Sequence, residues 1–163
     1  MKAYTTYVLP ILENNSVIWC PYLMQDVHSI ESVQRHYIKS ICRRCNLNIG
    51  SYLERLNALG LNTLEYRRCK YDVILVYKII HGLIDLNFSD FFSFSSSPYN
   101  LRRHSYSLKM SKFNTDVRKS FFSNRIIKLW NSLPDSVVNS PSIYIFRKRL
   151  DNFDLRTIYS MVY

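Results

Sequence analysis

Glycine and proline are scarce in this sequence: its 163 residues include three glycines and five prolines. A fold made of many short strands needs frequent tight turns, which these two residues favour, so the scarcity argues against a turn-rich all-β domain. Long apolar runs are absent as well, because no segment approaches the roughly 20 apolar residues that span a bilayer. These absences favour a mainly α-helical protein without a membrane partner.

Acidic residues are also in short supply. Twelve Asp and Glu stand against 22 Lys and Arg, which gives a formal net charge of +10 and an isoelectric point near 9.6. This balance favours a polyanionic partner, nucleic acid before an acidic membrane, although such charge can also serve solubility alone. Hydrophobic residues make up 47% and aromatic residues 15% of the chain, enough for a real core. We expect one domain, or one domain with a smaller appendage.

The cysteines indicate neither secretion nor a cofactor. The apolar run near the N-terminus contains Pro10 and stops at Glu13, which makes a poor signal peptide. We therefore expect an intracellular protein with reduced thiols, without a choice between nucleus and cytoplasm. Cys42-x-x-Cys45 resembles half of a zinc site, but the second close pair of ligands is missing. Structural cysteines are the favoured interpretation, and no metal or other cofactor is expected.

Apolar periodicity predicts the helices and divides the chain. The expected helices cover 4–19 (interrupted or kinked near Pro10), 26–42, 51–59, 63–82, 115–133 and 140–151, and 105–110 alternates like a short strand. Gly60 is well placed to be a left-handed C-cap of the helix at 51–59. A Phe- and Ser-rich texture around 88–98 marks a boundary. The expected organisation is a helical bundle over 1–87, a linker over 88–100, a smaller basic α-helical segment with a short β element over 101–155, and a tail over 156–163.

The basic residues form two candidate zones for binding nucleic acid. Along the helix at 26–42 and the residue after it, Arg35, Lys39 and Arg43 step by four on the side opposite the expected buried one. The expected buried side carries Val27, Ile30, Val33, Tyr37 and Ile41. The second zone lies between residues 101 and 133, where Asp116 is the single acid, and comprises Arg102, Arg103, Arg118, Arg125 and Lys128. Cations of this kind contact phosphates without reading sequence.

Aromatic residues are interleaved with the second set of cations and could stack on unpaired bases. Phe122 and Trp130, however, fit the apolar stripe of the expected helix at 115–133. We therefore expect these rings to belong to the core.

Catalytic patterns are missing from the sequence. His104 and Ser105 are adjacent, but no Gly-x-Ser-x-Gly elbow accompanies them and no acidic partner is nearby. There is no Gly-rich phosphate loop and no His-Glu-x-x-His pattern. No adjacent Asp-Asp pair exists to hold magnesium for a two-metal reaction. The sequence therefore predicts no catalytic residue.

Several short motifs occur in an order that resembles a known family. The early ones are Val17-Ile18-Trp19-Cys20-Pro21-Tyr22, Glu31-Ser32-Val33-Gln34-Arg35, and Leu64-Glu65-Tyr66-Arg67-Arg68. The late ones are Arg103-His104-Ser105, Phe121-Phe122, Trp130-Asn131-Ser132-Leu133-Pro134, and Phe146 with Leu150-Asp151. Together they resemble the C-terminal region, thumb and post-thumb, of the reverse transcriptase (RNA-directed DNA polymerase) of LINE-type, non-LTR retrotransposons. The sequence departs from the family pattern at Asn14, His36 and Arg103.

The resemblance implies a helical thumb that grips template-primer duplex, followed by a segment of poorly defined role. The Tyr-x-Asp-Asp polymerase signature of the family and its endonuclease do not occur in these residues. The expected function is thus that of a C-terminal fragment of this transposable-element enzyme, without polymerase activity of its own. It would bind RNA, DNA or an RNA–DNA hybrid, and a reverse-transcriptase palm is a further expected partner. The alternative hypothesis is a self-associating interaction module with no role in nucleic-acid binding.

Overall fold

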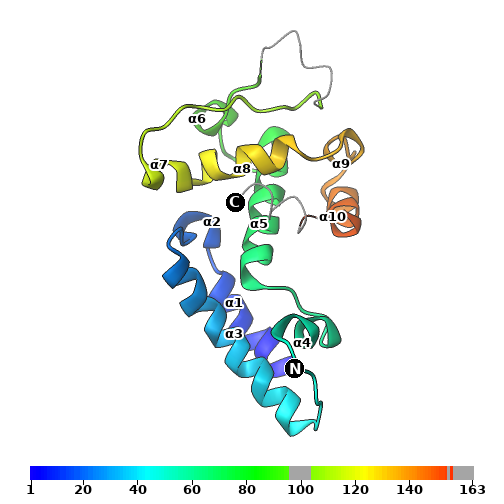
Figure 1. Cartoon of the computed structure of the whole chain (residues 1–163). Coiled ribbons are helices and arrows are strands. Elements are labelled where there is room, and N and C mark those ends of the chain that lie inside the picture. The colour runs from blue at the N-terminus through cyan, green and yellow to red at the C-terminus, as the bar shows by residue number, and fades with distance from the viewer. Residues whose placement is uncertain (96–103, 154, 156–163) are drawn as a thin grey trace. The chain divides into compact units, whose positions relative to one another are not determined.

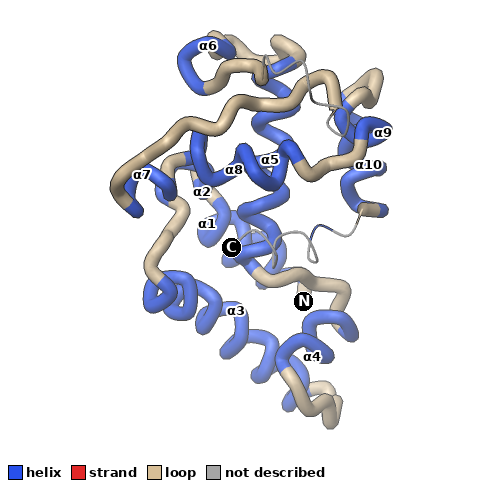
Figure 2. Tube along the Cα trace, turned by 45° about the horizontal axis from the view of Figure 1, so that its top comes forward, coloured by secondary structure: helices blue, strands red, loops and turns tan. Residues whose placement is uncertain are grey.

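The protein is described by a computed structural model, which covers residues 1–95, 104–153 and 155 (Figure 1). The described residues are mainly helical and include no strand, which confirms the predicted fold class. Figure 2 shows helices in both halves of the chain. The chain divides into two compact units, residues 1–68 and 69–163, and each is described by itself.

The first unit begins with three short helical pieces: η1 (Tyr4–Val8), α1 (Leu9–Glu13) and α2 (Ser16–Trp19). Near Pro10, where an interruption or kink was predicted, the helical run continues from η1 into α1 with a change of helix type. Pro10 lies in the first turn of α1, where a missing N–H costs little, and a π-helical turn precedes it. The helix breaks instead at Asn14 and Asn15, where Asn14 is extended and Asn15 has φ 52°.

The longest helix, α3 (Met24–Arg44), runs through the first unit, and α4 (Tyr52–Ala58) lies beside it (Figure 1). The buried side of α3 differs from the predicted one, because Val33 is exposed whereas Glu31 and Gln34 are buried. Apolar periodicity could not predict this, because the two polar side chains are buried together with hydrogen-bond partners from other segments of the chain. The core of the unit is otherwise apolar and consists of Tyr4, Leu9, Ile38, Cys42, Leu56, Leu61 and Leu64.

Both ends of α4 are capped. Ser51 and Glu54 form a reciprocal capping box, which lowers the pKa of the Glu54 carboxyl because the backbone and side chain of Ser51 donate to it. Gly60 has φ 65°, and the Leu61 amide donates to the Leu56 carbonyl at 2.9 Å. Gly60 is therefore the left-handed C-cap that the sequence predicted.

The helix α5 (Leu64–Ile80) ends two residues before the predicted end at Gly82, which has φ 61°. The second unit continues with α6 (Phe88–Phe91), α7 (Asp116–Ser120), α8 (Phe122–Asn131), α9 (Asp135–Val138) and α10 (Ile143–Asn152). The single helix expected over 115–133 is broken at Phe121, whose ψ of 144° is extended. Of the strand expected at 105–110, the described residues show one antiparallel bridge between Leu108 and Phe94.

The boundary between the units falls at 68/69, within α5, rather than in the expected linker at 88–100. Part of that stretch is packed into the second unit. Phe92 is buried, with its ring 5.7 Å from that of Phe122. The Phe- and Ser-rich composition therefore does not indicate a segment that lacks contacts with the rest of its unit. Residues 96–100 lie outside the described part, and the four-part division of the chain stays a prediction.

Candidate nucleic-acid interface

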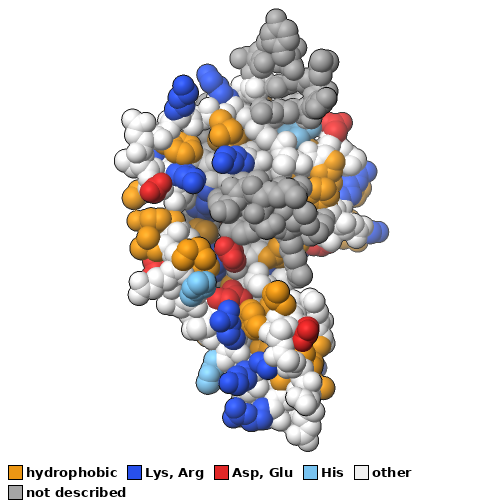
Figure 3. Space-filling view, in the orientation of Figure 1, with side chains coloured by type: hydrophobic (Ala, Val, Ile, Leu, Met, Phe, Trp, Pro, Cys, Tyr) orange, Lys and Arg blue, Asp and Glu red, His pale blue; other side chains and the backbone are white. Residues whose placement is uncertain are grey.

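The exposed side of α3 is cationic. Arg35, Lys39 and Arg43 are all exposed, as the sequence predicted. Each four-residue step turns about 40° around the helix, so the three side chains share one side. The helix has two carboxylates, Asp26 in its first turn and the buried Glu31. Figure 3 shows Lys, Arg and His side chains gathered on the surface over this helix.

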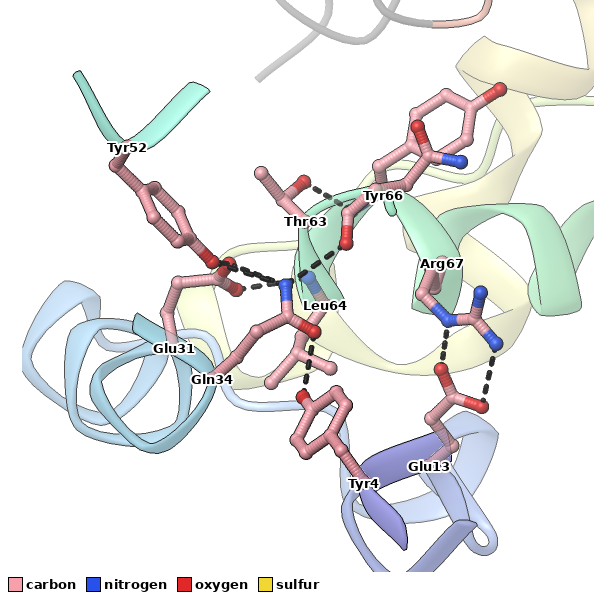
Figure 4. Close-up of polar contacts among 10 residues, drawn as sticks. Tyr4, Glu13, Glu31, Gln34, Tyr52, Thr63, Leu64, Tyr66 and Arg67 are labelled. Carbon is pink, nitrogen blue, oxygen red and sulfur yellow. Dashed lines mark hydrogen bonds and ion pairs between the residues drawn. The ribbon is translucent and has the colours of Figure 1, made fainter. Parts of the chain in front are cut away.

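A buried polar network fixes how α3 is rotated (Figure 4). Gln34 donates from Nε2 to the Tyr52 hydroxyl and to the Asn62 carbonyl, both at 3.0 Å. Its Oε1 accepts from the Tyr4 hydroxyl at 2.7 Å. The fully buried amide therefore links α3 with η1, with α4 and with the turn before α5.

Glu31 completes this network one helical turn earlier. Its Oε2 accepts from the Leu64 amide at 2.9 Å, so the carboxylate caps the N-terminus of α5. Its Oε1 accepts from the Tyr52 hydroxyl. Burial raises the pKa of the Tyr52 phenol above its ordinary value, and the hydrogen bond to Glu31 raises it further. The hydroxyl is thereby kept as a proton donor.

Arg35 takes its position from these contacts. Because Glu31 and Gln34 point inward, the next residue, Arg35, emerges at the edge of the buried side. Its guanidinium lies over the Tyr52 ring, 4.9 Å from the centroid. A cation–π contact holds the group without neutralising its charge. The Glu-x-Val-Gln-Arg motif thus combines two internal anchors with one cation on the surface, and no sequence pattern indicated that Tyr52 supports them all.

The arginines of the Leu64–Arg68 motif do not join this surface. Arg67 forms an ion pair with Glu13, in which Nη2 lies 3.0 Å from Oε2. Arg68 is 2% exposed, and its Nε and Nη1 have no hydrogen-bond partner among the described residues. Neither guanidinium is placed to meet a phosphate in this structure.

In the second zone the predicted residues have different environments. Arg118 and Lys128 are exposed. Arg125 instead forms an ion pair with Asp72, with side-chain exposures of 9% and 5%, so its prediction as a phosphate contact is corrected to an internal role. The sequence could not show this, because the partner lies 53 residues away. Arg102 and Arg103 lie outside the described residues. The two zones belong to separate units, and we treat them as separate surfaces.

The aromatic residues also divide into two kinds. Trp130 is fully buried and Phe122 half-buried, as expected for core rings. Phe121 is exposed, and the Arg118 guanidinium lies over its ring at 5.4 Å from the centroid. The adjacent Phe122 fits the apolar stripe of the expected helix. That pattern did not predict that Phe121 is more exposed than Phe122.

The four cysteines, all of them among the described residues, form no disulfide: Cys42 and Cys69 are buried, Cys20 half-buried and Cys45 exposed. Within the described ranges, no group of three or more His, Cys, Asp or Glu side chains is placed to hold a metal ion. None of the helices among the described residues is long and apolar enough to cross a membrane.

Comparisons with known proteins found no relative of this chain. No family model matches the chain, and neither the curated proteins nor the solved structures contain a significant match.

Proposed function

We propose that this chain is the thumb and post-thumb region of a LINE-type reverse transcriptase, and that it binds template-primer nucleic acid by phosphate contacts. The ordered motifs support the family origin. The observation that carries the binding is the exposed row Arg35, Lys39 and Arg43, which begins at the edge of the buried side of α3 and continues along its exposed side. No polymerase activity is proposed for the chain by itself, because the sequence lacks an adjacent Asp-Asp pair.

The dimensions of the row suit a nucleic-acid backbone. The helix rises about 12 Å between Arg35 and Arg43. Phosphates recur about every 3.4 Å along one strand of a duplex, so the row spans several of them. Cations of this kind contact phosphates of RNA, DNA and hybrid duplexes alike. The proposal is therefore binding without sequence specificity.

The test is the salt dependence of duplex binding. Replacement of Arg35, Lys39 and Arg43 together by alanine should weaken binding and reduce the slope of log K against log salt by about 0.9 for each phosphate that the variant no longer neutralises. A matched variant with alanine at the exposed Lys2, Arg147 and Lys148 removes the same charge elsewhere. An unchanged slope in a folded Arg35/Lys39/Arg43 variant would remove the assignment.

A second candidate function rests on the N-terminal pieces of the first unit. Tyr7, Ile11 and Ile18 are strongly exposed, although all three are large and apolar. Such side chains favour a protein contact, either a reverse-transcriptase palm or a second copy of this chain. Concentration-dependent sedimentation without oligonucleotide binding would favour this interaction module over the nucleic-acid proposal. Replacement of Ile11 and Ile18 by serine should then abolish the concentration dependence.

A further inference from the structure

Phe121 lies at the corner between α7 and α8 and is 52% exposed. Its extended backbone ends one helix and begins the next. The neighbouring ring, Phe122, turns inward and meets Phe92. The corner thus presents one aromatic side chain to solvent and buries much of the next.

Hydrogen bonds hold this corner rigidly. The Asn124 side chain donates from Nδ2 to the Arg118 carbonyl at 2.7 Å, and Arg125 Nη1 donates to the Ser120 carbonyl at 3.0 Å. The amides of Asn124 and Arg125 both donate to the Phe121 carbonyl at 2.9 Å. A ring on a fixed corner loses little conformational entropy when a ligand stacks on it.

The charge around the corner selects the kind of ligand. The guanidinium of Arg118 lies over the Phe121 ring, and Lys119 and Lys128 are exposed on the adjoining helices. Lys128 belongs to α8, the helix that begins directly after Phe121. Asp116 is the single acidic residue in α7 and α8. A polyanion with flat apolar groups fits this surface better than a protein patch does.

We propose that Phe121 and Arg118 form a stacking platform for an unpaired base, with Lys119 and Lys128 on the adjoining phosphates. The ligand class is single-stranded nucleic acid. In a duplex the faces of the bases are covered by their neighbours, so this platform acts on a different part of a nucleic acid from the cationic row of α3. The inference rests on the proposed function in that both need a polyanionic partner.

The first test compares a short oligothymidylate with an abasic oligonucleotide of the same length. Loss of one stacked base should make Phe121→Ala bind the oligothymidylate about tenfold more weakly. Binding of the abasic strand and of blunt duplex should be unchanged. Val117→Ala is the matched control, because Val117 is equally exposed, at 53%, and also apolar. Arg118→Ala should weaken binding of both single strands and reduce the salt slope by about 0.7.

A second readout is independent of whether Phe121→Ala folds well. In Phe121→Trp, the new indole should be quenched by the oligothymidylate and not by the abasic strand, after subtraction of the signal from Trp19 and Trp130. Equal quenching by both strands, or oligothymidylate binding without quenching, overturns the platform. So does a folded Phe121→Ala that binds oligothymidylate like the unaltered protein. If the α3 variant keeps its duplex salt slope while Phe121→Ala loses only base-dependent binding, the platform stands and the duplex proposal falls.

Discussion

Arg125 and Asp72, 53 positions apart in the sequence, form a two-contact ion pair in which Nε lies 2.7 Å from Oδ2 and Nη2 lies 3.0 Å from Oδ1. The remaining Nη1 donates to the Ser120 carbonyl. One guanidinium thus links α5, the end of α7 and the beginning of α8. Both side chains are nearly buried, so the charges depend on each other for compensation.

We therefore predict that Arg125→Ala destabilises the protein strongly, because the nearly buried Asp72 carboxylate loses the guanidinium that forms an ion pair with it. The expected loss is about 3–5 kcal/mol in the free energy of unfolding, measured by urea titration. The double variant Arg125→Met/Asp72→Leu should lose much less than the sum of the two single changes. Arg118→Ala removes an exposed cation from the same corner and should change stability by no more than about 0.5 kcal/mol. An equally small effect of Arg125→Ala would show that the pair contributes little.

The sequence was most informative where structure depends on neighbouring residues. Helical spacing placed Arg35, Lys39 and Arg43 on the exposed side of α3, and turn chemistry identified Gly60 as a C-cap. It failed where a partner is distant. Asp72, which forms the nearly buried ion pair with Arg125, belongs to another helix, α5.

The same limit explains the misassigned face of α3. Polar residues are expected outside, yet Glu31 and Gln34 enter the interior because Tyr4, Tyr52 and the first amide of α5 meet them there. No local pattern carries that information. The break at Phe121 was not predicted for a related reason. The Asn124 side chain, which lies after the break, donates a hydrogen bond to the Arg118 carbonyl at the end of the preceding helix.

Glu31 is predicted to stabilise the first unit. Glu31→Ala leaves the Leu64 amide and the Tyr52 hydroxyl without their acceptor in a buried place. Loss of hydrogen bonds to a buried charged group should cost about 2–3 kcal/mol, measured by urea unfolding. Glu31→Gln keeps one acceptor oxygen and should cost less. Ser32→Ala, on the exposed side of the same helix, serves as control. If it costs as much as Glu31→Ala, the network is not the cause.

His81 should make stability depend on pH. Its ring lies against Tyr77, with centroids 4.2 Å apart, and burial lowers its pKa from the ordinary 6.5. As the pH falls through 6.5, the unfolded chain takes up the proton before the folded protein does. The free energy of unfolding therefore decreases until the pH passes below the pKa of the folded state.

The prediction is checked by urea unfolding between pH 7.5 and 5. His81→Phe keeps an aromatic ring beside Tyr77 and removes the proton-binding group. The stability of this variant should fall less between the two pH values than that of the unaltered protein. His28 and His36 are exposed and are present in both proteins, so the difference reports His81. Equal pH dependence in the two proteins would contradict the assignment.

Substitution of Arg68, in contrast, is expected to stabilise the protein. The side chain is buried, and its Nε and Nη1 donate to no acceptor within the described ranges. A buried donor without a partner costs about 1–3 kcal/mol, so Arg68→Met, which keeps the unbranched stem, should raise the free energy of unfolding by a similar amount. Arg68→Lys keeps a buried charge and should give no such gain. If Arg68→Met instead destabilises while Arg68→Lys is tolerated, the positive charge is needed at this position.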